Sequence, residues 1–134
     1  MHFPIISFIV IALALAAVIE VDDSTIDNYL LTATPTILLL YAPWCGYCKR
    51  YFPEFEEIAA KYEHVSDQLQ FLRINADQNK ESFRKYQLRA YPTVRFVFGL
   101  TDDELHDIDA AAVSNAIRAK TGFEPKEIEV QEDL

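Results

Sequence analysis

The chain's two cysteines, Cys45 and Cys48, lie three positions apart at the junction of two kinds of secondary structure. The apolar run ahead of them, residues 36–41 (TILLLY), is typical of a buried strand, and residues 49–62 after them have helical periodicity. Positions i and i+3 of a helix share one face, so two sulfur atoms there can close a small disulfide with little backbone movement. The spacing therefore predicts a redox-active pair, with Cys45 at the start of the helix.

Cys45 is the predicted nucleophile of this pair. The free amide groups and the positive dipole end of a helix favour the thiolate, which is the form that attacks disulfides. If this end contributes about 2 kcal/mol, the pKa of the thiol falls by about 1.5 units from about 8.5, and roughly half of the thiol is ionised at neutral pH. We expect Cys48 to act as the resolving thiol that releases the product. Trp44, Gly46 and Tyr47 are expected to support the site.

The residues alone leave two other uses of this spacing open. The pair could be half of a zinc site, although structural zinc prefers four ligands and the chain's histidines are His2, His64 and His106. It could also be a purely structural disulfide, although so short a loop gives little entropic stabilisation. We expect neither, and predict a site without metal and without a cofactor beyond the Cys45–Cys48 disulfide.

The first 16 residues are predicted to be a signal peptide. Residues 3–19 carry no charged side chain, acidic residues begin at Glu20, and Ala14, Leu15 and Ala16 have the small-x-small pattern of a cleavage site. Cleavage after Ala16 would leave no membrane segment. The alternative is an uncleaved membrane anchor, which is marginal because a span needs about 20 apolar residues.

Residues 122–134 form an acidic tail that ends in Gln131, Glu132, Asp133 and Leu134. These four residues resemble a retrieval signal of the KDEL type, with Gln in the first position and the acids in the order Glu-Asp. Together with a signal peptide, they predict residence in the lumen of the endoplasmic reticulum. That compartment permits disulfides, so we expect this chain to exchange disulfides with other proteins.

Residues 17–121 are expected to form a single domain. The pattern predicts strands at residues 18–21, 36–42, 69–75, 93–98 and 104–108, and helices at residues 25–31, 45–62, 80–86 and 110–120. Strands that alternate with helices, followed by two adjacent strands, indicate an α/β fold whose mixed central sheet is covered on both faces.

Three short motifs are specific in combination: residues 41–49 (YAPWCGYCK), 53–55 (PEF) and 91–93 (YPT) before an aromatic strand. They resemble the redox-active domain of the thioredoxin superfamily, and in particular that of the protein disulfide isomerases. The resemblance covers roughly residues 18–120. It implies the thioredoxin fold, a mixed central β-sheet flanked by α-helices.

The resemblance also implies a substrate-binding role for Tyr91 and Pro92. The bond between them is expected to be cis, which is essentially a proline feature, and to face the active-site sulfur atoms. Backbone groups of Tyr91 would then bind an extended segment of a client protein by strand-like pairing. We therefore expect low specificity for client side chains.

The chain departs from the isomerase pattern in three places. Tyr47 stands where the family usually has His, and a neutral phenol cannot stabilise the thiolate by charge, so we expect a less oxidising disulfide. Leu39 stands where the family usually has a buried acid that accepts the proton of the resolving thiol, so we expect slow resolution by Cys48. The loop before the last helix, within residues 104–111, has no clear match for the arginine thought to assist that cysteine.

These observations predict a thiol-disulfide oxidoreductase of the endoplasmic reticulum lumen that resembles protein disulfide isomerase. Its partners would be client proteins with thiols or disulfides and a redox protein that reoxidises or reduces the pair. The net charge of −9 argues against nucleic-acid binding, which needs clustered Lys and Arg. The alternative is a redox-tethered client-binding module or holdase with slow turnover, which Leu39 and Tyr47 favour.

Overall fold

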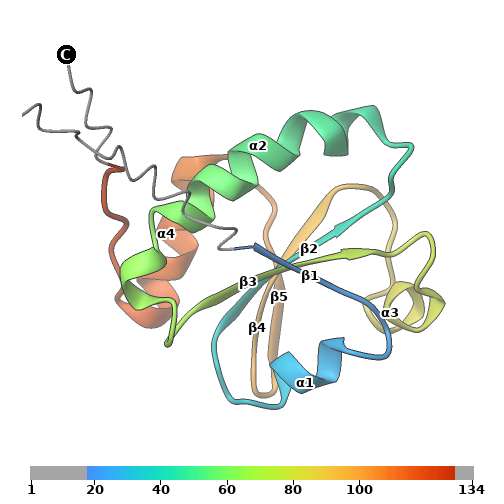
Figure 1. Cartoon of the computed structure of the whole chain (residues 1–134), viewed down its shortest axis with the longest axis horizontal. Helices are drawn as coiled ribbons and strands as arrows, with labels where there is room; N and C mark the ends of the chain where they lie inside the picture. Colours follow the sequence, from blue (N-terminus) through green and yellow to red (C-terminus); the bar gives the residue numbers. More distant parts are fainter. Residues whose placement is uncertain (1–17, 129–134) are drawn as a thin grey trace, which may run out of the picture.

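The computed structural model describes residues 18–128, in which helices cover both faces of a five-stranded sheet (Figure 1). The strands are β1 (Val18–Val21), β2 (Thr36–Tyr41), β3 (Gln70–Asn75), β4 (Thr93–Phe98) and β5 (Thr101–Glu104). The helices are α1 (Ile26–Leu30), α2 (Gly46–Ala60), α3 (Lys80–Lys85) and α4 (Ala110–Thr121), with a short 3₁₀ helix, η1 (Glu63–Val65), after α2. The expected mixed sheet flanked by helices is confirmed.

The strand order in the sheet is β1-β3-β2-β4-β5. Strands β1 and β2 run parallel to β3, whereas β4 is antiparallel to both β2 and β5. The central strand β2 is buried on both faces, and Ile37, Leu38, Leu39 and Leu40 are completely inaccessible to solvent. A strand covered by helices on both sides needs such a continuous apolar run rather than an alternating one.

Alternate strand residues face two separate cores. The core beneath α2 and α4 consists of Val18, Ile37, Leu39, Tyr51, Phe55, Ile58, Ala59, Tyr62, Leu69, Phe71, Val94, Phe96, Val113 and Ile117. The core on the side of α1 and α3 consists of Val21, Ile26, Leu38, Leu40, Leu72, Ile74, Ala76 and Tyr86. The two sets separate because successive side chains of a strand point to opposite faces.

The strand predicted at residues 104–108 is wrong, because β5 lies earlier, at Thr101–Glu104. Gly99 has a φ of 59° and opens a two-residue turn between β4 and β5, which sets the register of this hairpin. Leu105 and Ile108, which lie in the predicted strand, pack instead against the core beneath α2 and α4. All four residues of β5 are exposed, and its charged side chains protect the edge of the sheet from pairing with other chains.

Most of the two predicted terminal segments lies outside the described residues. The predicted signal peptide, residues 1–16, and the last six residues of the acidic tail, 129–134, are not among them. Within residues 18–128, no helix has both the length and the apolar character needed to cross a bilayer. The domain boundary at residue 121 coincides with the end of α4, where Gly122 has a φ of 77° and caps the helix.

Leu72→Ala is expected to lower the free energy of unfolding by about 2–5 kcal/mol, because it removes a fully buried side chain from the core beside α1 and α3. Leu100→Ala serves as the matched control. Leu100 is fully exposed in the β4–β5 turn, so its truncation should change the stability by less than about 0.5 kcal/mol. Urea titrations of the reduced protein measure both values, and equal losses would contradict this assignment of the core.

Candidate active site

The turn that leads from β2 into α2 positions Cys45. The backbone N–H of Cys45 donates to the carbonyl of Ala42 at 3.1 Å, and Pro43 occupies the second position of this turn, where its fixed φ is favourable. Cys45 has an extended backbone, with φ −76° and ψ 114°, and is the N-cap of α2 as predicted. Its Sγ accepts a hydrogen bond from the backbone N–H of Cys48 at 3.2 Å. The sulfur thus caps the N-terminus of the helix, as the side-chain oxygen of Ser or Asp commonly does.

The two sulfur-bearing residues differ in their access to solvent. Both are free thiols; Cys45 is 9% exposed, whereas Cys48 is completely buried. They form a small cluster with Ala42, against which Tyr41 and Phe52 pack. Among residues 18–128, no three His, Cys, Asp or Glu side chains are grouped closely enough to hold a metal ion. Of the two thiols, only that of Cys45 is therefore in contact with solvent.

The surroundings separate the pKa values of the two thiols. Burial acts to raise the pKa of Cys45, but hydrogen bonds from the Cys48 thiol and from the backbone N–H groups of Cys48 and Tyr47, together with the positive charge of Arg50, hold it below its ordinary value. Burial raises the pKa of Cys48 well above its ordinary value, and the contact with the Cys45 sulfur raises it further. This difference favours the thiolate at Cys45 and the protonated thiol at Cys48.

The loop between α3 and β4 lies beside this turn, at the end of the sheet where α2 begins (Figure 1). The Tyr91–Pro92 bond is cis, which confirms the prediction. Antiparallel pairing places Thr93, the first residue of β4, opposite Leu40 near the end of β2. As a result, the Cys45 thiol donates to the carbonyl of Tyr91 at 3.8 Å.

A cleft of ≈ 410 Å³ opens beside Cys45. It is lined by Trp44, Cys45, Phe83, Leu88, Arg89, Ala90 and Tyr91. The indole of Trp44 is 67% exposed and meets the ring of Tyr91 edge to face, with 5.8 Å between the ring centroids. A segment of another protein that reached Cys45 would therefore also contact this cleft.

Gly46 and Tyr47 begin α2 on the outer side of the site. A Cβ atom at Gly46 would have only the Nη1 atom of Arg50 within 4 Å, at 3.6 Å, so a small side chain would fit. The ring of Tyr47 is exposed, and the guanidinium of Arg50 lies over it at 5.6 Å from the centroid. The charge that favours the Cys45 thiolate therefore comes from Arg50.

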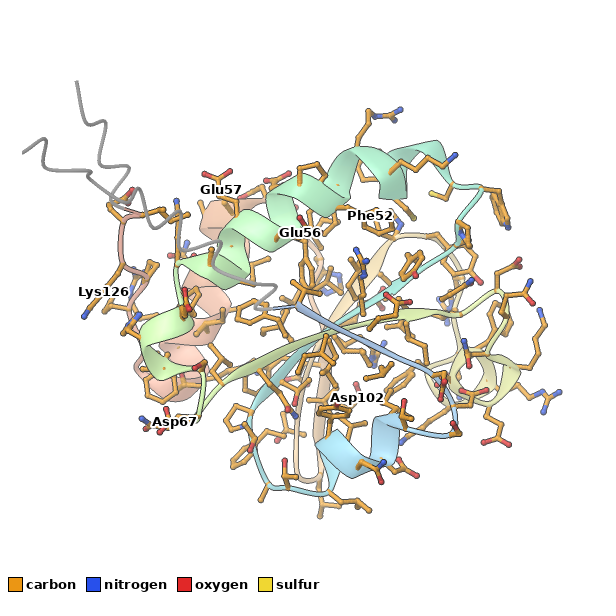
Figure 2. All side chains as sticks on the ribbon, viewed as in Figure 1. Phe52, Glu56, Glu57, Asp67, Asp102 and Lys126 are labelled. Atoms are coloured by element: carbon orange, nitrogen blue, oxygen red, sulfur yellow. The ribbon has the colours of Figure 1, made fainter. Side chains whose placement is uncertain are left out.

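The position of Leu39 carries an apolar side chain and no carboxylate. It is completely buried in the core beneath α2 and α4, and its neighbour in the sheet is Arg73 on β3. The guanidinium of Arg73 lies over the ring of Phe52, at 5.1 Å from the centroid, and pairs with Glu20 at 2.5 Å and with Glu56 at 3.6 Å. Phe52 and Glu56 lie on the side of α2 that faces the sheet (Figure 2). Arg73 therefore pairs with carboxylates at the surface.

The loop before α4 is attached to α2 by two polar side chains. Tyr51 donates its hydroxyl hydrogen to the carbonyl of Ile108 at 2.6 Å, and a carboxylate oxygen of Glu54 accepts from the backbone N–H of Ala110 at 3.2 Å. No arginine lies in this loop, as the sequence indicated. The two contacts hold the start of α4 against the helix that carries the cysteines.

The structure brings Trp44, Cys45, Cys48 and Tyr91 together at one end of the sheet, with Pro92 directly before β4. Their roles in a reaction stay predictions. Four further residues at the site were not predicted from the sequence: Arg50, Phe83, Leu88 and Arg89. The helical spacing of Arg50 from Gly46 could have identified the first. The other three come from α3 and the loop after it, and no local pattern connects them to the cysteines.

Comparisons with known proteins agree with this geometry. The family model described as thioredoxin matches residues 17–121. Protein disulfide-isomerase tigA of Aspergillus niger is 30% identical over 115 residues, which cover 83% of this chain and 32% of the relative. Protein disulfide-isomerase erp38 of Neurospora crassa is 30% identical over 119 residues, which cover 84% and 32% respectively. The chain thus spans about a third of the length of these curated relatives.

Solved structures show the same fold. The Trx4 domain of ERdj5 superposes with a TM-score of 0.69 at 23% identity, over 78% of this chain and 95% of that domain. The first thioredoxin domain of mouse protein disulfide-isomerase A4 superposes with a TM-score of 0.68 at 23% identity, over 86% and 81%. The prediction of a thioredoxin fold is confirmed.

Arg50→Ala is expected to raise the pKa of Cys45, because it removes a positive charge that favours the thiolate. The rate of alkylation by iodoacetamide, followed at Cys45 by mass spectrometry, should then reach its midpoint at a higher pH than in the unaltered protein. Arg84→Ala is the matched control, since Arg84 is an exposed cation of α3 outside the cleft. Equal midpoints in the Arg50 variant and the unaltered protein would contradict this role of Arg50.

Proposed function

Because the chain belongs to the thioredoxin family and has protein disulfide isomerases among its relatives, we propose that it is a thiol-disulfide oxidoreductase that acts on client proteins through its CGYC motif. Members of this family use a redox-active cysteine pair and need no external cofactor. One observation carries the proposal for this chain. The accessible sulfur, on Cys45, is the one that the start of α2 stabilises as a thiolate, while its buried partner stays protonated.

In the proposed reaction, the Cys45 thiolate attacks one sulfur of a client disulfide. A bond forms between Cys45 Sγ and that sulfur, the client's own S–S bond breaks, and its second sulfur leaves as a thiolate. Cys48 then loses its proton and attacks Cys45 Sγ, which closes the Cys45–Cys48 disulfide and releases the client's first sulfur as a thiolate. Two electrons pass from the pair to the client. The same steps in reverse oxidise a client dithiol.

Tyr91 and Pro92 would hold the client during this exchange. The carbonyl of Tyr91 lies 3.8 Å from Cys45 Sγ, so a client chain whose sulfur reached Cys45 would run along the backbone of this loop. An extended chain there could pair with the loop as an added strand. Trp44 lies across from Tyr91 and would shape the surface that the client meets.

We place this activity in the lumen of the endoplasmic reticulum. The proposal rests on the predicted signal peptide, residues 1–16, and on the retrieval-like residues 131–134 at the end of the acidic tail, residues 122–134. Both signals belong to secretory-pathway proteins, and the glutathione poise of the lumen allows a cysteine pair to cycle. The partners would be client proteins and a redox protein that restores the pair.

A second candidate is a client-binding module that captures thiols and releases them slowly. Leu39 favours it, because this fully buried residue offers no acceptor for the proton that Cys48 must lose. The raised pKa of Cys48 acts in the same direction, since only the thiolate of Cys48 can resolve a mixed disulfide. The two candidates share the first step and differ in the rate of the second.

Refolding of reduced ribonuclease in a glutathione buffer distinguishes the two candidates. An oxidoreductase restores ribonuclease activity when present at a small fraction of the client concentration. A slow module instead accumulates as a mixed disulfide with about one client per chain. Cys45→Ser should abolish both outcomes, and Cys48→Ser should leave only the mixed disulfide. If the unaltered chain neither refolds nor captures the client, the proposed function is wrong.

Leu39→Glu is expected to speed the release of the client from the mixed disulfide, because the carboxylate can accept the proton of Cys48. The variant should also lose stability, since it buries a charge in an apolar core. Leu39→Gln is the matched control, with the same size and no basic group. Stopped-flow measurement of client release from the mixed disulfide gives the rates. Release that is no faster in the Glu variant than in the Gln variant would count against a limiting proton transfer.

A further inference from the structure

The cleft beside Cys45 is large enough to hold part of another protein chain. Its volume, ≈ 410 Å³, lies near the lower end of the range of roughly 300–1,000 Å³ that protein pockets use for ligands, so it has room for one or two side chains. Cys45 is itself one of the lining residues. Whatever occupies the cleft therefore lies next to the sulfur atom that is being exchanged.

One part of the cleft is apolar. Trp44 and Phe83 line it from the active-site turn and from α3, and Leu88 lines it from the segment after α3. Trp44 is 67% exposed and Phe83 is 37% exposed, so both rings present apolar surface to water in the free protein. Exposed apolar surface of this kind commonly marks an interaction site. A large apolar client side chain would remove this surface from water.

The other part of the cleft carries a positive charge. Arg89 is the one charged side chain that lines it, and Arg89 is exposed without an ion pair in the described part of the chain. Arg50 and Lys49, in the first turns of α2, are likewise exposed and make no ion pair within residues 18–128. Arg73, Arg95 and Arg118, by contrast, all pair with carboxylates. Three cations that make no ion pair among the described residues thus lie at the site, and the charge of Asp77, which acts on Tyr91, opposes them only in part, in a chain whose net charge is −9.

In an extended client, the distance between side chains decides which client residues can reach these two parts of the cleft when the client cysteine lies at Cys45. If the client pairs with the loop of Tyr91 as a strand, side chains two positions apart point to the same side, about 6–7 Å from each other. A client residue two positions from the cysteine therefore reaches the apolar part of the cleft. The residue two positions to the other side of the cysteine points the same way, and the planar guanidinium of Arg89 in the same cleft can bind its carboxylate through two hydrogen bonds.

We propose that this cleft selects client segments in which a large apolar residue lies two positions to one side of the cysteine and an acidic residue lies two positions to the other side. The inference rests on the proposed function, because it concerns which clients reach the Cys45 sulfur. It replaces the low side-chain specificity expected from the sequence. It also opposes the simplest expectation from net charge, which is that an acidic protein attracts basic clients.

The test uses the full chain in its reduced form and peptides with a single cysteine held as a mixed disulfide with 5-thio-2-nitrobenzoate. Attack by Cys45 joins its sulfur to the peptide sulfur, breaks the mixed disulfide and releases coloured thionitrobenzoate. Four peptides carry Phe or Ser two positions to one side of the cysteine and Glu or Lys two positions to the other side, and a second set has the two sides exchanged. In one of the two orders, the Phe-Glu peptide should react at least about tenfold faster than the Ser-Lys peptide.

Two variants assign this preference to the cleft. In Arg89→Ala the ratio of Glu to Lys rates should fall toward one, and in Phe83→Ala the ratio of Phe to Ser rates should fall. Because each ratio compares peptides on the same variant, a general loss of folded protein cancels. Arg84→Ala is the matched control: Arg84 is an exposed cation of α3 that does not line the cleft, so both ratios should persist.

Two results would overturn the inference: faster reaction of the Lys peptides with the unaltered chain, or unchanged ratios in both cleft variants. Reduction of hydroxyethyl disulfide, a small uncharged substrate, separates this failure from that of the proposed function. A chain that reduces this substrate but does not discriminate among the peptides lacks only the client selection. A chain that does not reduce it lacks the oxidoreductase activity itself.

Discussion

The antiparallel pairing of β2 with β4 is the constraint on which the candidate active site depends. This register places Leu40 opposite Thr93, so the turn that leaves β2 and the loop that enters β4 meet at the same end of the sheet. Cys45 and Tyr91, which are 46 positions apart in the sequence, come into contact as a result. Side chains of both strands pack in the cores on the two faces of the sheet. The turn after β2 and the loop before β4 therefore have little freedom to move apart.

The difference between the two thiols follows from where each lies on α2. Cys45 is at the very start of the helix, where unpaired backbone N–H groups and the nearby Arg50 compensate the negative charge of a thiolate. Cys48, one turn further, is covered by Ala42 and by the rings that pack on this cluster. The attachment of α2 to the start of α4, through Tyr51 and Glu54, helps to hold this geometry. The two thiols thus differ in their electrostatic surroundings because they lie three residues apart at the start of one helix.

Leu39 shows how packing and chemistry compete in this fold. A buried carboxylate beneath the helix would cost free energy unless it were paired, and replacing such a group by a well-packed apolar residue is often neutral or stabilising. Here the apolar residue completes the core, and Arg73 instead joins Glu20 and Glu56 at the surface, stacked on Phe52. In the proposed reaction, Leu39 would offer no acceptor for the proton that Cys48 loses. Stability and rapid resolution of mixed disulfides would then place opposite demands on this position.

The sequence by itself determined most of the helices and strands, because hydrophobic periodicity reports directly on burial. It also determined the capping position of Cys45 and, through the resemblance carried by residues 91–93, the cis bond before Pro92. It misplaced β5, since the register of that hairpin depends on the turn at Gly99. Only the tertiary structure brought Phe83, Leu88 and Arg89 to Cys45. The physical reason is that the packing of α3 on the sheet sets these contacts, and packing between distant segments leaves no local pattern in the chain.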